Sequence, residues 1–258
     1  MRKAWITIAL AATLGCNSSD GGDPDVCPQT SASTLTLPAH PSFLMLVFYR
    51  TTGYHHMSIL PGVSAVSGLG AENNFSIEAT DDPVLFTDAN LARYAVVMFL
   101  STTGDVLDST QQAAFERYIR AGHGFVGVHS ATDTEYDWPW YHALVGATFM
   151  SHPALQQGTV IVVDATQAST QTLPNPWVRS DEWYNFTAQP TGVTVLARVD
   201  ESSYTGGTTG GTHPISWQHE YDGGRAWYTA MGHLSCAYGE GPFLNHLLGG
   251  IGWAARVY

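Results

Sequence analysis

Positive charge is scarce in this sequence. Lysine and arginine together number 10 against 22 acidic residues, which gives a formal net charge of −12. Lys3 is the only lysine, so the rest of the chain offers no Schiff-base lysine and no Walker-type phosphate loop. A chain this poor in basic residues is also a poor candidate for binding nucleic acid. These absences exclude lysine-based catalysis and argue against a nucleic-acid partner.

Cysteine is equally scarce, and one of the three cysteines falls in a signal-like N-terminus. Arg2-Lys3 precede an apolar run over residues 4–14 that is too short to span a membrane as a helix. We expect residues 1–15 to be an export signal, Cys16 to be a lipid anchor and the only membrane contact, and residues 16–40 to be a tether. This describes an exported cell-envelope lipoprotein. Because Thr13 stands where an aliphatic residue is usual, a soluble periplasmic or secreted protein is the alternative.

The other two cysteines have no metal-site spacing. An exported protein permits Cys27 and Cys236 to pair, and two unrelated thiols are the other interpretation.

From residue 41 to 258, apolar strand-like runs alternate with helical segments. Residues 42–48 form a near-continuous apolar run, typical of a strand buried on both faces. Ser109 and Gln112 have the spacing of a capping box, and Gly122 would end that helix. Further strands are expected at residues 75–79, 94–100, 124–128, 159–163, 193–199, 214–220 and 225–230. The alternation predicts one α/β domain with a mainly parallel, doubly wound sheet.

Histidines follow three of the expected strands. His55-His56, His129 and His233 each come shortly after an apolar run. Ligands of open α/β sheets bind beyond the carboxyl ends of the strands, and histidine suits proton transfer or metal binding near neutral pH. His129 occupies the turn between strand and helix where some α/β enzymes place a nucleophile. Without a cysteine there, hydrolysis of glutamine by a thiolate is excluded.

The order of these motifs resembles the trehalose-utilisation (ThuA-like) family over residues 42–258. The resemblance implies a flavodoxin-like, class I glutamine amidotransferase-like three-layer sandwich. It also implies a role with trehalose, related disaccharides or their 3-keto derivatives. The residues that carry it are Tyr49-Arg50, residues 53–59, residues 122–129, Phe149, His152-Pro153, Asp181-Glu182-Trp183-Tyr184, residues 213–217, Gly224-Arg225 and Gly232-His233.

The candidate site residues divide into two groups. As catalytic residues we expect His129, His233, Glu182 and Tyr184. As substrate-binding residues we expect His55, His56, His152, Asp181, Trp183 and Trp217.

Three chemistries fit this set. In the first, His55 or His56 binds a divalent metal together with His129 and His233, with or without Glu182 or Asp181, and the metal polarises a sugar carbonyl or activates water. In the second, a histidine is a general base without a metal, and a carboxylate or Tyr184 is its partner. A paired-carboxylate arrangement would need a second acid such as Asp81, Asp82 or Asp133. In the third, the protein is a cell-surface module that binds a carbohydrate without turnover.

Overall fold

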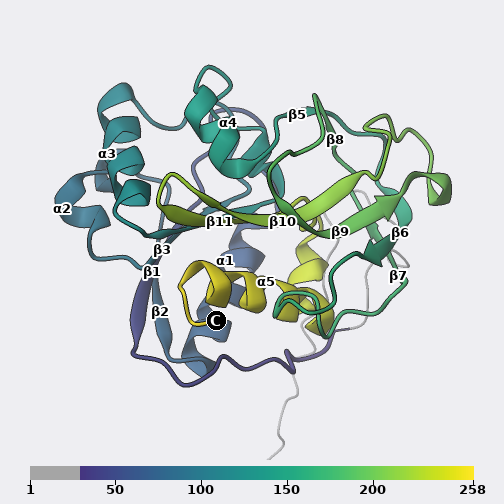
Figure 1. The fold of residues 1–258 in the computed structure, drawn as a ribbon, viewed down its shortest axis with the longest axis horizontal. Coiled ribbons are helices and arrows are strands. Elements are labelled where there is room, and N and C mark those ends of the chain that lie inside the picture. Colours follow the sequence, from purple (N-terminus) through teal and green to yellow (C-terminus); the bar gives the residue numbers. More distant parts are fainter. Residues whose placement is uncertain (1–29) are drawn as a thin grey trace, which may run out of the picture.

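The computed structural model describes residues 30–258, which form a three-layer α/β sandwich (Figure 1). A nine-stranded sheet in the order β2-β1-β3-β4-β11-β10-β9-β6-β7 is the middle layer. Its strands are β1 (Phe43–Phe48), β2 (Phe75–Thr80), β3 (Val96–Leu100), β4 (Gly124–Val128), β6 (Gln156–Val162), β7 (Trp177–Asp181), β9 (Thr194–Asp200), β10 (Pro214–Tyr221) and β11 (Gly224–Thr229). Two short strands, β5 (Phe149–Ser151) and β8 (Asn185–Phe186), form a second sheet.

Five helices cover the two faces of the large sheet. Helices α1 (Ile59–Glu72) and α5 (Gly241–Ala254) lie on one face, where they contact each other. Helices α2 (Asp88–Leu91), α3 (Ser109–Arg120) and α4 (Pro139–Val145) lie on the other (Figure 1). This arrangement confirms the α/β domain that the alternation of strands and helices predicts and the three-layer sandwich that the resemblance implies.

Most strands of the sheet run in one direction. Strands β2, β1, β3, β4 and β11 are parallel to one another. From β11 through β10, β9 and β6 to β7, each strand is antiparallel to its neighbour. Only β6 and β10 therefore run opposite to the other strands of this sheet. Every residue of β3 and β4 is buried, as expected for central strands covered on both faces. The carboxyl ends of β1, β4 and β11 therefore meet at one edge of the sheet.

Strand β7 lies in a stretch where the sequence shows no strand pattern. Three of its five residues are buried polar groups, namely Arg179, Ser180 and Asp181. Because a period-2 pattern assumes that buried positions are apolar, these buried polar residues conceal the strand.

The capping box of α3 begins one residue earlier than expected, so the assignment to Ser109 and Gln112 is wrong. Asp108 accepts hydrogen bonds from the amides of Thr110 and Gln111, and the Gln111 side chain accepts one from the Asp108 amide. The side-chain Nε2 of Gln112 instead donates to Oε2 of Glu135 at 2.6 Å. Local sequence spacing could not predict this contact between Gln112 and Glu135, because Glu135 is distant in the sequence.

The part of the expected tether that the structure describes packs against the domain. The Asn245 side chain on α5 accepts hydrogen bonds from the amides of Thr34 and Leu35, and Leu35 is buried. The expected signal, Cys16 and Cys27 lie outside the described residues. Cys236 is disulfide-bonded. Within residues 30–258, no helix is both long and apolar enough to cross a membrane.

Candidate metal and substrate site

The turn after β4 places His129 at the centre of the site. His129 has φ 53°, a left-handed conformation that is uncommon outside glycine, and it opens a short 3₁₀ helix over His129–Thr132. Its ring is fully buried, and Nδ1 lies 2.8 Å from the Ala230 carbonyl oxygen. Since a carbonyl only accepts, Nδ1 carries a proton, and Nε2 faces the site.

Histidines from two other segments face the same nitrogen. His56 comes from the segment after β1, and its Nε2 lies 3.2 Å from Nε2 of His129. His233 follows β11, and its Nδ1 lies 3.3 Å from Nε2 of His129. His55 is exposed, and its Nδ1 lies 3.1 Å from the Thr51 hydroxyl. Of the two adjacent histidines, His56 therefore belongs to the cluster and His55 does not.

Glu182 and Tyr184 complete the cluster from the segment after β7. Oε2 of Glu182 lies 3.2 Å from Nδ1 of His233 and 3.5 Å from Nε2 of His129. Oε1 of Glu182 lies 3.1 Å from Nδ1 of His152, which is 41% exposed. The Tyr184 hydroxyl lies within hydrogen-bond distance of Nε2 of His129, at 3.1 Å. Six of the ten expected site residues thus meet in one place, namely His56, His129, His152, Glu182, Tyr184 and His233.

The environment fixes the protonation state of these groups. Burial, assisted by the neighbouring charges of His129 and His233, lowers the pKa of His56 to about 2, so its ring is neutral. Burial alone would raise the pKa of Glu182, but hydrogen bonds with His129 and His233 hold it well below its usual range. Burial raises the pKa of Tyr184 well above its ordinary value, so it remains a phenol. The cluster therefore offers the neutral imidazole of His56, the Glu182 carboxylate and the Tyr184 hydroxyl.

The donor atoms have the spacing of ligands around one metal ion. The ligand atoms of His56, His129, Glu182 and His233 all lie within 4.8 Å of one another. Two ligand nitrogens at about 2.0–2.1 Å from a tetrahedral zinc ion lie about 3.3–3.4 Å apart. The measured separations of 3.2 and 3.3 Å from His129 to the other two histidines match this value.

A pocket of about 380 Å³ opens onto this cluster. Its volume falls within the range of small-molecule sites. Asp133 lines it, four residues after His129, and accepts a hydrogen bond from the Tyr136 hydroxyl at 2.5 Å. Burial raises the pKa of the Asp133 carboxyl. The pocket is lined by Tyr54, His56, Asp133, Phe149, His152, Glu182 and Tyr184.

Three residues that we expected to bind substrate lie in the interior instead. Trp217 is fully buried, and its Nε1 donates to the Val145 carbonyl at 2.8 Å. Trp183 is 1% exposed and donates to the Gln156 carbonyl at 3.1 Å. Asp181 has no exposed surface and is hydrogen-bonded to backbone amides. None of the three lines the pocket, because burial in the core satisfies their polar atoms.

The sequence indicates Asp133 only as one of three possible second acids, and it does not single out Tyr54 or Phe149 as pocket residues. Asp133 follows shortly after the turn at His129, and this position in the sequence is the feature that could have indicated it. Asp81 and Asp82 lie after β2 and are exposed, and neither lines the pocket.

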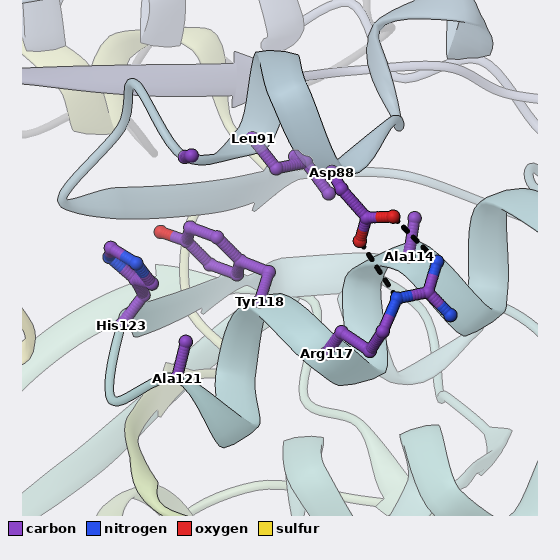
Figure 2. Close-up of a pocket in the computed structure, with 8 residues that line it drawn as sticks. Asp88, Leu91, Ala114, Arg117, Tyr118, Ala121 and His123 are labelled. Atoms are coloured by element: carbon purple, nitrogen blue, oxygen red, sulfur yellow. Dashed lines mark hydrogen bonds and ion pairs between the residues drawn. The ribbon is translucent and has the colours of Figure 1, made fainter.

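A second pocket, of about 190 Å³, lies between α2 and α3 (Figure 2). Figure 2 shows the Asp88 carboxylate paired with the Arg117 guanidinium, at 2.8 Å, beside the ring of Tyr118. His123 stacks on Tyr118 and directly precedes β4, so it lies at the amino end of that strand. His129 follows the carboxyl end of the same strand. The second pocket is therefore at the opposite edge of the sheet from the cluster.

Comparisons with known proteins agree with this architecture. A family model described as "Trehalose utilisation" (ThuA) matches residues 45–254. A thua-like protein from Bacteroides uniformis is similar in structure, with a TM-score of 0.71, 24% identity and coverage of 84% of this chain and 94% of that chain. A thua-like protein from Parabacteroides merdae has a TM-score of 0.68, 18% identity and coverage of 84% and 90%.

A more distant similarity is to a β-galactosidase from Bacillus circulans. The TM-score is 0.53 and the identity 14%, and the match covers 82% of this chain but 31% of that chain. At these identities the solved structures show the fold alone. No curated protein matches the sequence.

Proposed function

We propose a function from one established premise: the chain belongs to the ThuA family of trehalose utilisation. The family is concerned with carbohydrate, so we propose that this protein is a metal-dependent enzyme acting on a disaccharide or a 3-keto-glycoside. The observation that carries the proposal is the convergence of His56, His129, His233 and Glu182 at ligand spacing below a pocket.

The charges around the cluster support a bound cation. Asp181, Glu182 and Glu240 are buried carboxylates, and Arg179 is the buried guanidinium that pairs with two of them. Buried charge is costly unless it is compensated, and a divalent ion beside Glu182 would compensate the remaining negative charge. Imidazole with one carboxylate suits zinc, iron, nickel and copper.

The ligand set leaves room for a substrate. His56 and Glu182 line the pocket, so an ion held by these two residues with His129 and His233 would lie beside it. When bound there, the metal would polarise a sugar carbonyl or lower the pKa of a water molecule. The Tyr184 hydroxyl, which points at His129, would donate to an oxygen of the substrate.

Asp133 is suited to move the proton. Its carboxyl lines the same pocket as Glu182, and the pKa values of these two acids shift in opposite directions. Pairs of acids separated in this way have different roles in catalysis. Asp133 would exchange the acidic C–H proton beside a keto group, while Glu182 stays ionised beside the histidines. The same pair of acids favours metal-free acid–base catalysis as the second candidate.

Export is a separate proposal. The N-terminal sequence supports an exported lipoprotein anchored through Cys16, with a soluble periplasmic or secreted form as the alternative. The disulfide at Cys236 supports an oxidising compartment in either case.

Elemental analysis of the purified protein tests the proposed function. We expect near-stoichiometric transition metal in the wild type and a large loss in His129→Ala. Both proteins are then assayed on trehalose and on 3-keto-glycosides, with product formation followed by mass spectrometry. Absence of metal after reconstitution would refute metal dependence, and turnover without metal would leave the acid–base mechanism. Carbohydrate binding with no turnover of any sugar would identify a non-catalytic binding module.

A further inference from the structure

One buried carboxylate connects the two segments that carry His233 and Glu182. Oδ1 of Asp181 accepts hydrogen bonds from the backbone amides of Glu182 at 3.0 Å and His233 at 3.1 Å. Oδ2 accepts from the backbone amide of Gly232 at 3.0 Å. Strand β7, where Asp181 lies, is four places from β11 in the sheet. These bonds therefore fix two donors of the cluster relative to each other across a long separation in sequence and sheet.

A guanidinium holds this carboxylate from the other side. Nη2 of Arg179 lies 3.2 Å from Oδ2 of Asp181, and Nη1 lies 3.1 Å from Oε2 of Glu240. The Arg179 guanidinium lies over the rings of Trp177 and Phe243, at 4.5 and 5.1 Å. Its side chain is 2% exposed. Such an enclosed guanidinium compensates the buried charge and restricts the rotation of the Asp181 carboxylate.

The loop after β11 depends on this carboxylate for its position. The Ala230 carbonyl at its start accepts the Nδ1 proton of His129, and His233 ends it. Gly232 between them has φ 115°, where a side chain would be strained, and an added Cβ would lie 2.9 Å from the Tyr238 hydroxyl. The loop thus touches His129 at one end and supplies His233 at the other, with the Asp181 bonds in between.

We propose that Asp181 is a positioning residue that sets the separation of the His233 and Glu182 donors and thereby the affinity and geometry of the metal site. The inference rests on the proposed metal function. Asp181 does not line the pocket and touches no substrate, so the expected effect is on metal binding. Loss of a group that orients metal ligands typically weakens metal affinity about 10–100-fold.

The test compares Asp181→Asn with Glu240→Gln in the full protein. Both variants remove one buried carboxylate charge beside Arg179, but Glu240 pairs with Arg179 and the Trp177 indole rather than with the backbone amides that hold the ligand-bearing segments. Two readouts are measured: cobalt(II) affinity with its visible spectrum, and hydrogen exchange of the Gly232 and His233 amides in the metal-free protein. We expect Asp181→Asn to weaken cobalt binding about 10–100-fold, to alter the spectrum and to accelerate exchange at both amides. Glu240→Gln should change affinity less than about threefold, well below the loss expected at Asp181.

Each outcome bears on one proposal. Wild-type cobalt affinity, spectrum and amide exchange in Asp181→Asn would overturn the positioning role. If the wild type binds no cobalt, the proposed function fails, and the amide exchange still decides whether Asp181 holds the loop. If Asp181→Asn does not fold because Arg179 has lost a partner, the double variant Arg179→Met/Asp181→Asn, which removes opposite charges together, carries the same two measurements.

Discussion

The two adjacent histidines His55 and His56 provide a matched pair for testing the cluster. His56 is 3% exposed and its Nε2 faces His129 at 3.2 Å, whereas His55 is exposed and outside the cluster. Zinc that binds only the folded protein stabilises it by about 4.1 kcal/mol at a thousandfold excess over Kd. For a domain of this size, about 1 kcal/mol corresponds to about 2–4 °C in Tm. We therefore expect zinc to raise the wild-type Tm by about 8–16 °C.

The two alanine variants should respond differently to the same zinc concentration. Removal of a metal ligand should weaken zinc binding at least as much as removal of a group that orients a ligand. We therefore expect zinc affinity to fall about a hundredfold in His56→Ala. The remaining stabilisation is then about 1.4 kcal/mol, or about 3–6 °C. His55→Ala should keep the wild-type shift.

Differential scanning calorimetry with and without zinc measures these shifts, and each variant is compared with its own metal-free form. Because the metal-free form of the same variant is the reference, the stability lost with the buried His56 ring does not enter the zinc shift. Equal zinc shifts in His56→Ala and the wild type would refute the ligand role of His56. A smaller zinc-induced shift in Tm for His55→Ala alone would show that His55, and not His56, is the ligand.

Three further predictions concern the acid, the pH dependence and the core. Asp133→Asn should lower kcat about 100-fold or more while leaving the metal content unchanged, as expected for a general acid–base group, and steady-state kinetics with elemental analysis checks this. Burial lowers the pKa of His246 to about 4. In the unfolded chain the same imidazole binds a proton below about pH 6.5, so the free energy of unfolding decreases as pH falls from about 6.5 to about 4. The loss is about 2 kcal/mol by pH 5, and urea denaturation of His246→Gln should show a correspondingly smaller slope with pH. Trp217→Phe should cost about 2 kcal/mol of unfolding free energy by leaving the Val145 carbonyl without its donor, and unchanged sugar affinity would agree with its place in the core.

Much of the fold could be predicted from local sequence patterns. Strands β1, β3 and β4 are apolar along their length, and apolar runs bounded by turn residues indicate buried strands in any context. Strand β7 could not be found in this way. Its buried Arg179 and Asp181 are stable only because they pair with each other and with groups from distant segments.

The site was predictable in part for the same reason. The turn after β4 indicated His129, and the end of β11 indicated His233, because parallel strands deliver their carboxyl ends to one edge. Local spacing could not choose between His55 and His56, since either side chain of adjacent residues can point inward. It also could not show that Trp183 and Trp217 find carbonyl partners in the core.

The α/β alternation, the acidic character and the histidines at the ends of three strands can be read from the amino-acid sequence, because each of these depends on composition or on neighbours along the chain. Only the folded chain shows which histidine faces His129, where Glu182 and Asp133 lie, and how Asp181 joins β7 to the loop at Gly232. Those relations depend on the path of the sheet across many residues. The distances between donors of a metal site follow only from that path.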